Sequence, residues 1–160
     1  MTLKLGNVLT GGYEFDDTDP EGYRAGVINF GGAERALIGD PLAVKAFEIP
    51  PGENLCPYHY EYVEEWLIVL EGSVAVRVPD GEEEAQAGDV MRFPAGPDGG
   101  HKLTNRGELT ARVVMFSSAH EPNVSVYPDS DKVGVWVWNP QDHLMVKRAD
   151  GSVDYYEGET

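Results

Sequence analysis

Glycine and proline recur along the whole chain and divide it into short segments. The 160 residues include nineteen glycines and eleven prolines, and no segment places apolar residues at helical spacing over three turns. This distribution of glycine and proline predicts many short strands joined by turns rather than a helical bundle. A chain of this length can bury one hydrophobic core, so we expect a single domain over residues 1–160.

The expected strands are apolar or alternating runs bounded by turn residues. They cover residues 26–30, 42–49, 66–70, 73–78, 90–93, 102–104, 110–116 and 133–138. In the run 73–78, for example, Val74, Val76 and Val78 fall on one face. Residues 82–87 are instead compatible with a short turn of helix. The pattern indicates an antiparallel β-sandwich or barrel, and a small barrel either fills its interior with side chains or encloses one ligand.

The charge balance excludes several classes of partner. Twelve Lys and Arg face twenty-eight Asp and Glu, a formal net charge of −16. Because such a surface repels phosphate backbones and anionic lipid, we expect no nucleic-acid or membrane partner. No apolar run is long enough for a signal peptide or a membrane span, and the single cysteine, Cys56, cannot form an intramolecular disulfide. We therefore expect a cytoplasmic protein with an inert thiol at Cys56.

Two of the four histidines lie where metal-binding side chains can meet. On an extended segment His59 and Glu61 point to the same face, and a turn then brings Glu65 to the start of the next strand, which can return it beside them. His101 follows a turn rich in Gly and Pro and could reach a barrel interior from the opposite side. Imidazole and carboxylate groups that converge from adjacent strands suit a divalent transition metal.

These stretches, residues 51–72 and 88–105, resemble the paired motifs of the cupin superfamily, which are small jelly-roll β-barrels. Glu65 is followed after six residues by Gly72, as in the family's first motif. The second motif is matched at Gly88, Pro94, Gly96, His101 and Asn105, with four residues rather than two before His101. Residues 126–135 also resemble a stretch found in a subgroup of bacterial cupins. The resemblance implies an all-β antiparallel jelly-roll barrel over about residues 42–117, with N- and C-terminal extensions at 1–41 and 118–160.

The first motif allows two registers. In one, Glu61 holds the family's second histidine position, and the resemblance implies a metal held by His59, Glu61, Glu65 and His101. In the other, the family's spacing after Gly52 is kept, Tyr58 and Tyr60 take the ligand positions, and no metal site remains. We favour the first register because a lone Glu65 inside a barrel would lack a partner for its buried charge. The side chains that we expect to line the cavity are Tyr58, Tyr60, Arg92 and Asn105.

Two histidines and two glutamates suit iron, manganese, zinc, nickel or cobalt without discriminating among them. Such an ion keeps one or two positions for dioxygen or a small molecule with vicinal oxygens, and acts there as Lewis acid or redox centre. The resemblance implies activities that include dioxygenases, decarboxylases and isomerases, as well as binding proteins that catalyse nothing. We expect a cupin that binds or transforms a small organic molecule at a divalent metal. The alternative is a metal-free ligand-binding or interaction module with a degenerate motif. Metal binding should weaken as the pH falls through ~6.5, where free imidazole becomes charged.

The remaining expectations concern the surface. Cupin barrels often pair through their outer sheet, so the resemblance suggests a homodimer, with the late strand carrying Trp136 and Trp138 as a candidate contact. The chain after Ser118 can instead pack along its own barrel. We expect His120 and His143 to be surface residues.

Overall fold

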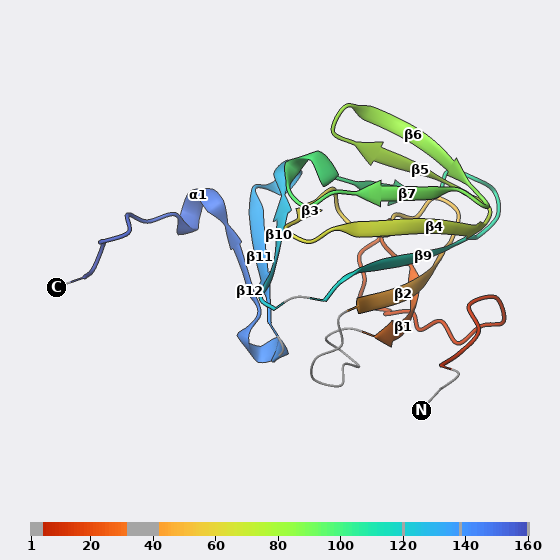
Figure 1. Ribbon diagram of the computed structural model, residues 1–160, viewed down its shortest axis with the longest axis horizontal. Helices are drawn as coiled ribbons and strands as arrows, with labels where there is room; N and C mark the ends of the chain where they lie inside the picture. Colours follow the sequence, from red (N-terminus) through yellow and green to blue (C-terminus); the bar gives the residue numbers. More distant parts are fainter. Residues whose placement is uncertain (1–4, 32–41, 120, 138, 160) are drawn as a thin grey trace.

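The computed structural model describes residues 5–31, 42–119, 121–137 and 139–159. Antiparallel strands are its main regular elements (Figure 1). The strands are β1 (Gly26–Gly31), β2 (Leu42–Ile49), β3 (Tyr60–Glu61), β4 (Glu65–Glu71), β5 (Ser73–Val78), β6 (Gly81–Gln86), β7 (Val90–Phe93), β8 (Lys102–Thr104), β9 (Ala111–Ser118), β10 (Asn123–Tyr127), β11 (Lys132–Trp136) and β12 (Leu144–Lys147). Single 3-10 turns lie at Pro97–Gly99, Pro128–Ser130 and Pro140–Asp142, and one helical turn, α1, at Arg148–Gly151.

Two sheets enclose the core of the barrel. One has the order β1-β2-β9-β4-β7 and the other the order β6-β5-β8. Because side chains alternate along a strand, every second residue faces inward; Leu67 and Val69 of β4 meet Val74 and Val76 of β5 in this way, each at most 1% exposed. The expected all-β antiparallel barrel is confirmed.

The expected helical turn at residues 82–87 is wrong. This segment lies in β6, which pairs with β5 from Ser73↔Gln86 to Val78↔Gly81. A single helical turn closes few hydrogen bonds, whereas the two-residue turn at Pro79 and Asp80 lets the chain pair along its whole length with β5. Only Ala85 of β6 is buried, so hydrogen bonding rather than apolar burial accounts for this strand.

A third sheet, of order β12-β11-β10-β3, lies beside the barrel, and the C-terminal segment leads away from it (Figure 1). β10 pairs with β3 at Ser125↔Glu61 and Val126↔Tyr60. A bridge between His59 and His101 joins the start of β3 to the start of β8. The C-terminal sheet is thereby attached to the barrel at the segment that carries the expected metal ligands. Within the described residues, none of the helical segments has the length and hydropathy of a transmembrane helix.

Candidate metal centre

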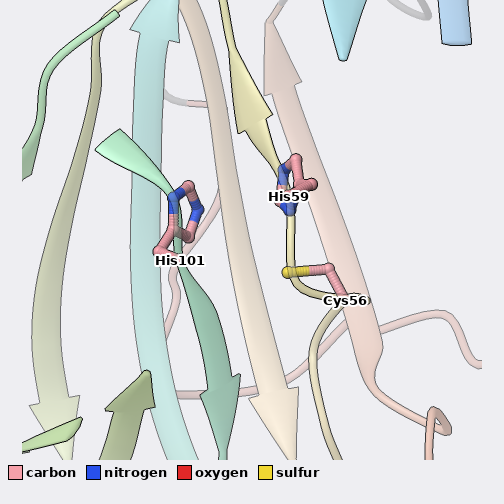
Figure 2. Close-up of side chains that lie close together, drawn as sticks. All are labelled: Cys56, His59 and His101. Carbon is pink, nitrogen blue, oxygen red and sulfur yellow. The ribbon is translucent and has the colours of Figure 1, made fainter. Parts of the chain in front are cut away.

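The structure brings His59 and His101 into direct contact. Their backbones exchange two hydrogen bonds, with N···O distances of 3.1 and 2.8 Å, and their ring centroids are 4.8 Å apart. Figure 2 shows the two imidazoles on neighbouring segments of chain, with the Cys56 side chain close to both. Residues 42 positions apart in the sequence therefore occupy one site.

Both imidazole rings have the same orientation with respect to the backbone. Nδ1 of His59 donates to the Pro57 carbonyl and Nδ1 of His101 to the Gly99 carbonyl, each at 2.9 Å. Because a carbonyl oxygen only accepts, the proton of each neutral ring lies on Nδ1 and Nε2 offers a lone pair. This is the arrangement in which metal-binding histidines are held by a backbone carbonyl.

Glu61 and Glu65 complete the cluster. Glu61 Oε1 lies 3.9 Å from His59 Nε2, and Glu65 Oε2 lies 3.6 Å from His101 Nε2. Ligand atoms of His59, Glu61 and Glu65 all lie within 4.8 Å of one another. The two carboxylate side chains are each 15% exposed, so the cluster can be reached from solvent. The structure thus brings together the four residues of the first register.

Burial shifts the proton affinities of two of these groups. Burial raises the pKa of Glu65 to about 8; the nearby Glu61 carboxylate adds to this effect and the Lys45 ammonium opposes it. Burial lowers the pKa of His101 to about 4, and His59 adds to the effect. The expectation that protonation near pH ~6.5 weakens metal binding therefore uses the wrong pKa for His101, because that value belongs to imidazole in water.

The C-terminal sheet fixes the Glu61 carboxylate. Asn123 Nδ2 donates to Glu61 Oε2 at 2.6 Å, and Ser125 Oγ donates to Glu61 Oε1 at 2.8 Å. Ser125 is 1% exposed and accepts a hydrogen bond from Trp136 Nε1 at 2.8 Å. Sequence reasoning missed Asn123 and Ser125, because they lie more than sixty positions from Glu61 and only the β3–β10 pairing brings them near it.

An aromatic ring stacks on each of the two imidazoles. Phe93 stacks on His101 with ring centroids 3.9 Å apart and an interplanar angle of 13°, and Tyr127 stacks on His59 at 5.6 Å and 21°. Rings packed in this manner restrict rotation of the imidazoles, so both Nε2 atoms are held in place before any ligand binds.

The four residues that we expected to line the cavity make contacts elsewhere in the structure. The Arg77 guanidinium lies 3.9 Å from the Tyr58 ring centroid, and Tyr60 packs edge-on against Tyr62. Arg92 binds Glu64 on the face of β7 opposite Phe93. Asn105 is fully buried and donates to the carbonyls of Ile49 and Leu109.

The other residues singled out from the sequence have different environments. The Cys56 sulfur lies within 4.8 Å of ligand atoms of His59 and His101, yet burial raises the pKa of its thiol to about 12, with Glu65 adding to the effect. His143 is exposed and its Nε2 bonds to the Val137 carbonyl. His120 and Trp138 lie outside the described residues.

The donor set fits a divalent metal ion. His101 Nε2 is completely buried and has no hydrogen-bond partner among the described residues, an arrangement that costs about 1–3 kcal/mol when nothing binds the atom. Distances of 3.6 and 3.9 Å between donors are too long for hydrogen bonds. They match two donors that share one ion at about 2.1 Å from each.

Comparison with known proteins agrees with the fold. Residues 46–117 match the family described as the cupin domain. The tetracenomycin polyketide synthase protein TcmJ of Streptomyces glaucescens is 31% identical over 99 residues, which are 58% of this chain and 64% of that protein, so the match spans less than two thirds of that relative.

Two solved structures share the fold at 20% sequence identity. A candidate sugar phosphate isomerase from Acidithiobacillus ferrooxidans superposes with a TM-score of 0.76 and covers 96% of each chain. The polyketide cyclase RemF from Streptomyces resistomycificus superposes with a TM-score of 0.60, over 77% of this chain and 84% of that one. The barrel, the family match and the paired motifs agree: the chain contains a cupin domain at residues 46–117.

Proposed function

We propose that this cupin binds one divalent transition-metal ion through His59, Glu61, Glu65 and His101, and uses it to bind or transform a small organic molecule. The observation that carries the proposal is the buried His101 Nε2, which has no hydrogen-bond partner among the described residues and lies 3.6 Å from Glu65 Oε2. The ligands are two neutral imidazoles and two carboxylates, which together balance a charge of +2 and suit iron, manganese, zinc, nickel or cobalt.

The chemistry of the similar proteins supports a substrate that carries several oxygen atoms. The names of two of these proteins refer to a sugar phosphate and to a polyketide. Both classes of molecule are rich in oxygen, the donor atom through which a substrate would bind at the open positions of the ion. The bound ion would supply Lewis-acid or redox chemistry to these oxygens. The residues of the chain hold the donors in place: carbonyls orient both imidazoles, and Asn123 with Ser125 orients Glu61.

Metal analysis of protein purified without chelators tests the proposal. We expect about one transition-metal ion per chain in the wild-type protein and a loss of most of it in His101→Ala and in Glu65→Gln. His143→Ala is the matched control, because it removes an exposed imidazole that is bonded to the Val137 carbonyl, and it should keep the metal. Folding of each variant is checked by circular dichroism.

Two outcomes would contradict the proposal. Wild-type protein that neither contains a transition metal nor takes one up from solution would favour the metal-free binding module. Metal content that is equal in the wild type, His101→Ala and Glu65→Gln would place the ion elsewhere on the acidic surface.

We also propose that two copies associate through the outer face of the five-stranded sheet. Trp66 and Phe116 stack there with ring centroids 6.2 Å apart, and Val90 on the same face is 56% exposed. The Arg92–Glu64 ion pair borders the apolar residues and supplies both signs of charge, so that two copies of this face can be complementary across a two-fold axis.

A further inference from the structure

Lys45 lies on the inner face of the barrel, although lysine is among the residues least often buried. Phe47 and Ile49, two and four positions further along β2, both pack in the core. Because side chains alternate along an unbroken strand, Lys45 faces the same side. Its partner in the pairing of β2 with β9 is Met115, which is itself a core residue.

The Lys45 ammonium lies close enough to the Glu65 side chain for the two groups to interact electrostatically across the barrel interior. Lys45 nevertheless forms no hydrogen bond or ion pair through its ammonium with any residue that the structure describes. A half-buried ammonium without a direct partner is free to donate hydrogen bonds to a ligand.

Small and polar residues separate Lys45 from the cluster. Ser117 on β9 pairs with Glu65 on one side and with Ala43 on the other. On the inner face these two residues therefore lie beside Glu65 and next to the Lys45–Met115 pair. Their short side chains leave the Lys45 ammonium and the cluster facing the same part of the interior.

The charge of this interior becomes more positive when a metal binds. Without an ion, the Lys45 ammonium faces the Glu61 carboxylate and the Glu65 side chain. A divalent ion balances both carboxylates, and the charge of Lys45 is then left without a counterion beside the ion's open positions. An unbalanced charge in a partly desolvated site is unfavourable unless an opposite charge joins it.

We propose that Lys45 binds an oxyanion of the substrate, such as a carboxylate, a phosphate or an enolate, while the metal binds another of its oxygens. This inference rests on the proposed metal site and adds the class of ligand. It explains how a protein with a net charge of −16 can take up an anion: the attraction arises inside the barrel and only when the metal is present.

Calorimetric titration of Co²⁺-loaded protein tests the inference. Oxalate, inorganic phosphate and imidazole are used as separate probes: two anions of different chemistry and one neutral metal ligand. We expect Lys45→Gln to weaken the binding of oxalate, of phosphate or of both by roughly 10- to 100-fold, as for loss of a hydrogen bond to a charged group. Imidazole should bind Lys45→Gln and the wild type equally, because it needs only the ion. The metal-free protein should bind neither anion.

Two further variants separate the ammonium from other effects. Lys45→Arg keeps the charge and should retain most of the anion affinity. Lys147→Gln removes the same charge from an exposed position on β12 and should behave as the wild type.

The outcomes distinguish this inference from the proposed function. Equal anion affinity in Lys45→Gln and the wild type, or no anion binding by cobalt-loaded wild-type protein, overturns the inference and leaves the metal site intact. Failure of the wild type to bind Co²⁺ overturns the metal site and the inference with it. Unchanged imidazole binding shows that Lys45→Gln still folds around the ion.

Discussion

At the scale of single residues, Glu65 links the metal centre to the stability of the fold. Burial, and to a smaller extent the Glu61 carboxylate, raises its pKa to about 8. Between pH 4.5 and 8 the folded metal-free protein therefore keeps a proton on Glu65 that the unfolded chain, with a pKa near 4.5, has released. This contribution to stability is complete below about pH 4.5 and is lost as the pH rises through about 8. We expect the free energy of unfolding of the metal-free protein to fall by roughly a few kcal/mol between pH 5.5 and 8.5.

Urea unfolding in the presence of a chelator measures this effect. In Glu65→Gln the amide does not titrate, so the decline should be much smaller. A wild-type decline no steeper than that of Glu65→Gln would show that Glu65 ionises freely in the folded protein. Saturating metal should also flatten the decline, because the ion binds the ionised carboxylate.

Cys56 should behave as a neutral thiol in spite of its place beside the histidines. Burial, with the charges of Glu65 and Glu61, raises its pKa to about 12, and only the thiolate reacts as a nucleophile. We expect a disulfide reagent to label the metal-free protein at pH 8 at least ~100-fold more slowly than it labels a free thiol with a pKa of about 8.5. The rate is followed spectroscopically in native and urea-unfolded protein. Fast labelling of the native protein would show an exposed or activated thiol.

The four residues of the proposed metal centre could be brought together from the sequence, but their environment could not. Alternation placed His59 and Glu61 on one face, and the family motif added Glu65 and His101. Alternation could also have placed Lys45 on the inner face, since it is in phase with Phe47 and Ile49 in an apolar strand. The pKa of His101 near 4 depends on burial by Phe93 and neighbouring strands, which a motif does not contain.

At the scale of elements, β10 supports the metal centre through Ser125. The serine hydroxyl donates to Glu61 Oε1 and accepts from Trp136 Nε1, so it holds the carboxylate toward the cluster. We expect Ser125→Ala to weaken metal binding by about 10- to 100-fold, as is usual when a residue that orients a metal ligand is lost. Competition with a chelating dye measures the affinity.

Ser73→Ala is the matched control for this prediction. It makes the same change at a partly buried serine on β5, away from the cluster, and should keep wild-type metal affinity. If Ser125→Ala lowers thermal stability but leaves the metal affinity unchanged, then the hydroxyl serves only the packing of the C-terminal sheet.

Strands in which apolar and polar residues alternate could be predicted from the sequence. Strands that bury few apolar side chains and are held by backbone pairing could not. The expected ranges 42–49, 73–78, 90–93 and 102–104 agree with β2, β5, β7 and β8, each of which buries an apolar residue. β6 carries Glu82, Glu83 and Glu84 and exposes all three, so its pattern contains no signal of burial. β3 has two residues and exists because β10 pairs with it, a contact between distant parts of the chain.

At the scale of the whole molecule, the outer face of the five-stranded sheet is suited to a second copy. On β4 and β9 several of the residues that point away from the core are apolar: Trp66 pairs with Phe116 and Ile68 with Val114. A large apolar face that remains exposed usually marks an interaction site. The sheet is also open at β7, where Val90 pairs with Ile68 and remains more than half exposed.

Light scattering after size exclusion tests this assembly. We expect a mass of twice 17.5 kDa, and a shift to the monomer in Val90→Glu, because each copy would bring an unpaired carboxylate into the buried contact. Val90 is exposed in the single chain, so the substitution should leave the barrel folded and the metal content unchanged. Leu109→Glu is the control, since Leu109 is 78% exposed and lies in the turn before β9, outside this face. A dimer that withstands Val90→Glu as well as it withstands Leu109→Glu would place the contact on another surface, because a glutamate at the edge of an apolar two-fold interface appears twice and cannot pair with itself.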